Sequence, residues 1–149
     1  MKFLKSFKYA IEGFLHCVKS ERNFRVHLVA TVVVILLAVY FDLSVYEILT
    51  LTIAIALVLI CEMLNTAIER TIDAIRELDE RDNRPNGHLG NFPVADLATD
   101  SLDGLQQNYI DQLRKIGKDV AAGAVFVSSI FAMIVGVVIF LPKILEVLR

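Results

Sequence analysis

Three long apolar runs predict three helices that cross a membrane. The first two, residues 28–41 and 48–61, contain no charged side chain, and the third, residues 120–141, is interrupted only by two serines and two glycines. The third run can span a bilayer alone, because a spanning helix needs about 20 apolar residues. The first two reach that length when each extends by a turn, and the short segment between them fits a hairpin. The predicted spans are residues 24–43, 46–68 and 117–141.

The first 22 residues follow a different pattern. Apolar residues recur there at spacings of three and four, with lysines on the other faces. This predicts an amphipathic surface helix over residues 1–22, lying at the membrane interface. Packing of the same helix against the protein is the alternative, which the basic polar face beside a spanning helix disfavours. A cleavable signal peptide would instead require a short apolar region and a small-residue cleavage site.

The connector between the second and third spans is rich in Asp, Asn, Gly and Pro. It predicts a cytoplasmic loop insertion over residues 74–113, although alternating charges allow helix to continue over 76–84 and a helical piece fits 102–113. The predicted fold class is therefore an all-α membrane protein. One domain, residues 1–149, would contain the surface helix, three transmembrane helices and this loop.

Composition and charge support a membrane location and give it an orientation. The chain is 56% hydrophobic, which is too apolar for an ordinary soluble domain of its size. Lys and Arg concentrate before the first span and between residues 70 and 118, whereas the first hairpin has none. Basic residues stay on the cytoplasmic side, so the N terminus would be inside and the C terminus outside. We expect no nucleic-acid partner, and the two cysteines fit small packing residues better than a redox pair.

A polar stripe enters the end of the second span. Glu62, Asn65, Glu69 and Asp73 lie at offsets of three, seven and eleven, which places them in one sector of a helix. Ionisable groups at membrane depth are costly and usually functional. Glu62 lies deepest and is the candidate proton acceptor, whereas Glu69 lies nearer water and is the candidate cation ligand.

The predicted topology brings further charges to the same membrane face. Glu21 precedes the first span, and Lys118 and Asp119 open the third. Each has a simpler interpretation, as an interfacial ion pair of Glu21 with its neighbouring arginines or as a helix start among the headgroups. No phosphate-binding glycine loop, Cys-x-x-Cys or nucleophile elbow occurs in the sequence, so nucleotide chemistry would rely on carboxylates and Mg²⁺.

These residues carry a resemblance to a known family. The segment from Glu62 to Glu69, followed by Asp73, resembles the signature of the small prokaryotic diacylglycerol kinases, and residues 7–13, 21–25 and 118–125 resemble further blocks of it in order. The amino-acid sequences of these blocks are more similar to the Gram-positive branch of the family, whose members are undecaprenol kinases. The resemblance implies a homotrimer in the bacterial plasma membrane, with active sites shared between subunits. It also implies transfer of phosphate from ATP, with Mg²⁺, to undecaprenol or alternatively to diacylglycerol.

The resemblance also implies roles for individual residues. Glu62 would be the catalytic general base, Glu21 and Glu69 the metal ligands, and Asn65 a residue that orients the substrate. The positions that would bind ATP are Tyr9, Glu21, Glu69, Asp73, Lys118 and Asp119.

One departure and two rival functions accompany the resemblance. The family has a short connector with a Glu-Tyr-His-like turn, whereas this chain has a long acidic one without an equivalent His, and Asp111 stands near the expected place. A proton-coupled transporter would also place a carboxylate such as Glu62 in the membrane. Such a carboxylate would lie near the midplane, whereas the acidic residues of this chain cluster at one membrane face. A structural assembly partner would not need Glu62.

Overall fold

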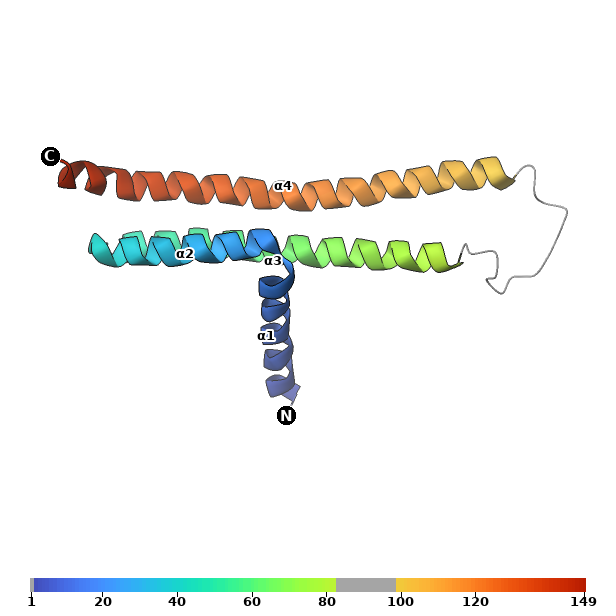
Figure 1. The fold of residues 1–149 in the computed structure, drawn as a ribbon, viewed down its shortest axis with the longest axis horizontal. Helices are drawn as coiled ribbons and strands as arrows, with labels where there is room; N and C mark the ends of the chain where they lie inside the picture. The colour runs from blue at the N-terminus through green and yellow to red at the C-terminus, as the bar shows by residue number, and fades with distance from the viewer. Residues whose placement is uncertain (1, 83–98) are drawn as a thin grey trace.

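The computed structural model describes residues 2–82 and 99–149, and every regular element in them is an α-helix. The helices are α1 (Lys2–Ser20), α2 (Arg22–Tyr40), α3 (Val45–Asp82) and α4 (Thr99–Val147). Figure 1 shows α2, α3 and α4 running alongside one another, with α1 crossing their common direction. The expected all-α class is confirmed.

Three of these helices are long and apolar enough to cross a membrane, over Arg22–Tyr40, Val45–Leu78 and Gln107–Val147. This confirms the number of spans expected from the sequence. Many of their large apolar side chains point outward, as with Leu36 at 64% exposure and Phe126 at 66%. Such contiguous apolar surface indicates contact with lipid or with another protein chain.

The junction between α1 and α2 fixes their crossing. Phe24 is fully buried and meets the ring of Phe14 edge-on at 5.4 Å between centroids. Arg25 Nη1 donates to the carbonyls of Val18 and Lys19 at 3.3 and 2.9 Å. These are carbonyls of the last turn of α1, which have no partner within the helix. The bend therefore places Glu21 between two fixed helix ends.

The α2–α3 hairpin closes with two capping motifs. Asp42 adopts a φ of 47°, and Leu43 N–H donates to the Ala38 carbonyl at 3.1 Å, which is the Schellman pattern. Ser44 N–H then donates to Glu47 Oε2 at 2.8 Å, and Ser44 Oγ accepts from Glu47 N–H at 3.4 Å, forming a capping box for α3. The backbone N–H groups of residues 41–44 are therefore all hydrogen-bonded.

Helices α3 and α4 form the most extensive helix pair. Small residues such as Ala54, Ala121 and Ser128 are buried, which lets membrane helices approach closely. A Cβ on Gly117 would lie 3.1 Å from Ile72 Cδ1, so α4 passes close to α3 at this level. At the opposite end of the pair, Lys143 Nζ lies 3.5 Å from Glu47 Oε1.

The structure differs from the expected loop over 74–113. Residues 74–82 continue α3, and residues 99–113 belong to α4. No Pro or Gly occurs between residues 74 and 84, so nothing in the sequence stops the helix there. In α4, a single Gly104 among strong helix formers costs only about 1 kcal/mol, too little to end the helix. The Pro- and Gly-rich remainder of the predicted loop lies outside the described residues.

Candidate functional site

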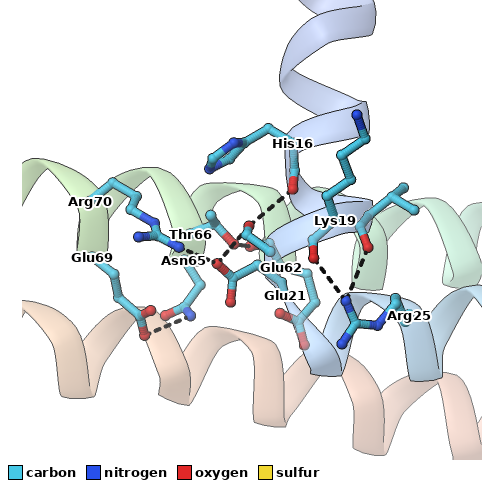
Figure 2. Close-up of polar contacts among 11 residues, drawn as sticks. His16, Lys19, Glu21, Arg25, Glu62, Asn65, Thr66, Glu69 and Arg70 are labelled. Atoms are coloured by element: carbon cyan, nitrogen blue, oxygen red, sulfur yellow. Dashed lines mark hydrogen bonds and ion pairs between the residues drawn. The ribbon is translucent and has the colours of Figure 1, made fainter.

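The polar stripe of α3 passes from the interior to the surface. Glu62 and Thr66 are buried at 3% and 4% exposure, Asn65 and Glu69 are half-buried, and Asp73 is exposed. Figure 2 shows Glu62, Asn65, Glu69 and Arg70 on α3 beside the α1–α2 junction, where Glu21 lies. The order of burial follows the order of the residues along the helix.

Glu62 meets a histidine that sequence reasoning left aside. His27 Nε2 of α2 lies 3.2 Å from Glu62 Oε1, with 26% of the His27 side chain and 4% of the Glu62 side chain exposed. The distance suits an ion pair with a protonated imidazole, yet among the described residues no hydrogen bond is directed at Oε1. One signal in the sequence could have indicated this contact, because His27 is the titratable residue that directly precedes the first apolar run.

Asn65 connects the deep and shallow parts of the stripe. Its Nδ2 donates to Glu69 Oε1 at 3.0 Å, which orients the carboxylate. Its Oδ1 is buried and has no hydrogen-bond partner among the residues that the structure describes. A buried amide oxygen without a partner is costly, so this atom is available to a ligand.

Glu21 reaches α3 from the α1–α2 junction. Its Oε1 accepts hydrogen bonds from Ser20 Oγ at 3.0 Å and from Arg70 Nη2 at 3.1 Å. Arg70 follows Glu69 directly, so this pair brings Glu21 to the shallow end of the stripe. The simpler interpretation paired Glu21 with neighbouring arginines, but Arg25 is engaged with the end of α1.

Lys118 joins α4 to the same stripe. Its ammonium donates a hydrogen bond to Asp73 Oδ1 and forms an ion pair with it, next to the close approach at Gly117. In residues 5–78 and 107–149, no hydrogen bond or ion pair joins Tyr9 or Asp119 to the stripe, and Tyr9 is 67% exposed. Asp111 pairs with Arg114 on its own helix at 3.1 Å.

An apolar groove of about 470 Å³ begins at His27 and runs between α2, α3 and α4 towards Phe140. Its lining is almost wholly aliphatic, and Thr31 and Ser129 are its neutral polar side chains. His27, at one end of the groove, also contacts Glu62, which is not itself a lining residue. The groove can hold part of a long apolar chain whose end lies beside His27.

Comparison with known proteins gives concordant matches. The sequence profile of the family described as prokaryotic diacylglycerol kinase matches residues 8–84 and 98–140. The undecaprenol kinase of Bacillus subtilis (strain 168) is 32% identical over 142 residues, covering 95% of this chain and 90% of that protein. The diacylglycerol kinase of Synechocystis sp. is 32% identical over 145 residues, covering 97% of this chain and 66% of that protein. No solved structure matches the chain.

Proposed function

We propose that this chain, which belongs to the prokaryotic diacylglycerol kinase family and is therefore a lipid kinase, phosphorylates the hydroxyl of undecaprenol with ATP and Mg²⁺. The observation that carries the proposal is the buried carboxylate of Glu62 in contact with His27, a lining residue of the apolar groove. Diacylglycerol is the alternative acceptor, supported by the Synechocystis relative. Membership of this family favours the kinase function over the two rival functions, the proton-coupled transporter and the structural assembly partner.

The groove accounts for the acceptor. An isoprenoid chain is apolar along its length and matches the aliphatic lining between His27 and Phe140. Its single hydroxyl would then lie at the His27 end of the groove, where His27 contacts Glu62. The polar groups at Thr31 and Ser129 are too few to read an ester-rich headgroup along the groove.

The oxygen donors suit Mg²⁺. No group of three or more His, Cys, Asp and Glu side chains in the described residues forms a preformed metal cage. Mg²⁺ does not require one, because it commonly binds one or two carboxylates together with phosphate oxygens and water. Glu21 and Glu69 would hold the ion, and the buried Asn65 Oδ1 supplies a further oxygen. When bound, Mg²⁺ supplies charge neutralisation for the nucleotide phosphates.

The transfer step uses Glu62 as the proton acceptor. The lipid O–H bond breaks, and its proton passes to the Glu62 carboxylate. The lipid oxygen bonds to the γ-phosphorus of ATP, whose bond to the β-phosphate oxygen breaks to release ADP. Lys118, now on Asp73, would neutralise phosphate charge, since such catalysis is mainly positioning and electrostatic stabilisation.

The proposal includes a homotrimer with the N terminus inside and the C terminus outside. Leu57 and Cys61 of α3 and Gly123 of α4 line an outward apolar depression of about 600 Å³, where another helix can approach closely. Tyr9 and Asp119 have no hydrogen bond or ion pair with the stripe of their own chain in the described part of the protein. An active site shared between subunits would bring them to a neighbour's stripe.

Side-by-side turnover tests the function. Purified protein in lipid nanodiscs receives γ-labelled ATP and Mg²⁺ with either undecaprenol or diacylglycerol. We expect labelled phosphate on both diacylglycerol and undecaprenol, with the larger kcat/KM for undecaprenol. A larger value for diacylglycerol would reverse the acceptor assignment, and no label on either lipid would refute the kinase function.

A further inference from the structure

The contact between His27 and Glu62 has no role in the function proposed above. Glu62 is the most deeply buried carboxylate of the stripe, with 4% of its side chain exposed. A carboxylate removed from water needs a partner to remain ionised. His27 Nε2, at 3.2 Å, is the titratable group that contacts it in the described residues. The other charges acting on Glu62 are Glu21 and Glu69, which repel it.

His27 also lines the groove that begins at this point. Its imidazole therefore touches two features at once, the buried carboxylate and the space for the lipid chain. The position is set at both ends of α2, because Arg25 ties its first turn to the end of α1 and the hydrogen-bonded hairpin follows its last residue. Thr31, one turn further along, bonds to the His27 carbonyl at 2.8 Å.

We propose that His27 is a positioning residue for phosphoryl transfer, whose imidazole, 3.2 Å from Glu62 Oε1, packs against that oxygen and leaves Oε2 for the lipid hydroxyl. This inference rests on the proposed kinase function. His27 neither binds ATP nor takes the substrate proton. It fixes the rotamer of the carboxylate that does, and a displacement of about 1 Å in a reacting group costs about 100-fold in rate.

Three substitutions test the contact. His27→Leu keeps a similar volume without a nitrogen, and His27→Asn keeps an amide that is too short to reach Glu62. His27→Gln places an amide nitrogen close to the position of Nε2. His16→Leu is the matched control, because His16 is an exposed histidine of α1 whose imidazole has no contact with Glu62 in the described residues.

We expect kcat for lipid phosphorylation to fall roughly 10- to 100-fold in His27→Leu and His27→Asn. KM for ATP should stay within about threefold in both, since the nucleotide positions Asp73 and Lys118 lie at the other end of the stripe and no ATP-binding position is substituted. His27→Gln should recover most of the lost kcat, and His16→Leu should match the wild type. Helicity measured by circular dichroism, together with ATP binding, identifies any variant that fails to fold. If His27→Leu does not fold, the polar variant His27→Asn still allows loss of the contact to be compared with His27→Gln.

Two results would overturn the inference. Wild-type kcat in His27→Asn would show that Glu62 needs no partner. Equal losses in His27→Asn and His27→Gln, with KM for ATP rising in parallel, would show a general packing role. Failure of the proposed function is a separate outcome, because wild-type protein would then phosphorylate neither lipid.

Discussion

Replacing Glu62 by Gln removes the proton acceptor while keeping the size and hydrogen-bonding shape of the side chain. Glu62 is 3% exposed, so water cannot easily take its place as the base. A positioned general base typically contributes a factor of about 10² to 10⁴ in rate. Since each factor of ten is about 1.4 kcal/mol, the activation barrier should rise by about 2.8–5.6 kcal/mol.

The same substitution should spare stability and ATP binding. A neutral amide is less costly to bury than a carboxylate, and His27 can still meet it at 3.2 Å. The nucleotide positions Asp73 and Lys118 lie three turns further along the stripe, where α4 joins it. We therefore expect the Kd for ATP to change by less than about threefold while kcat falls by at least about 100-fold.

Thr66→Val is the matched control for this experiment. Thr66 lies one turn from Glu62, is 4% exposed and donates only to the Glu62 carbonyl, at 3.0 Å. That carbonyl belongs to the helix, so losing the hydroxyl should cost no more than about 1 kcal/mol of stability. The assay is single-turnover transfer of labelled phosphate to undecaprenol in nanodiscs, with ATP binding measured by calorimetry. A Glu62→Gln enzyme within about threefold of wild-type kcat would refute the role of this carboxylate.

Further predictions concern the metal, the nucleotide and the helix pair. Glu69→Gln should raise the Mg²⁺ concentration for half-maximal activity roughly tenfold and weaken Mg²⁺-ATP binding, because it removes a carboxylate ligand; unchanged Mg²⁺ titrations would contradict this. Lys118→Met should raise KM for ATP several-fold, whereas Lys115→Met, at an exposed position on the same helix, should not. Equal KM values for the two variants would show that Lys118 only pairs with Asp73 and does not bind the nucleotide. Gly117→Ala should be tolerated, because only the flexible end of Ile72 lies 3.1 Å from the new Cβ. Gly117→Leu should lower the free energy of unfolding by about 1–3 kcal/mol. Equal midpoints for the two variants in thermal unfolding in detergent would contradict the close approach of α3 and α4.

The helices were predictable because their signals are local. Uninterrupted apolar runs of spanning length, a basic amphipathic segment and a period of 3.6 residues depend only on neighbouring positions. The same period placed Glu62, Asn65 and Glu69 on one face of α3, and their graded burial follows from the direction in which that helix leaves the apolar region.

The contacts between helices were not predictable in the same way. Each helix of a hairpin can rotate and slide against its neighbour, so the sequence does not specify that His27 meets Glu62 or that Arg70 takes Glu21. The predicted loop over 74–113 was too long, because its Asp- and Asn-rich composition outweighed the local helix signals at its two ends. The helix allowed over 76–84 is present up to residue 82, and the helical piece over 102–113 belongs to α4.

The hairpin turn at residues 41–44, on the opposite side of the bilayer, sets the height of His27 relative to Glu62. His27 lies 13 residues before the end of α2 at Tyr40, and Glu62 lies 17 residues after the start of α3 at Val45, distances of about 20 and 26 Å along the two helix axes. A residue inserted into α2 between His27 and this turn would shift His27 by about 1.5 Å along the helix axis and rotate it by about 100° relative to the turn. The turn therefore fixes how α2 and α3 align at the site. Mutations in it lie on the far membrane surface, and we expect them to lower activity without contacting the substrate.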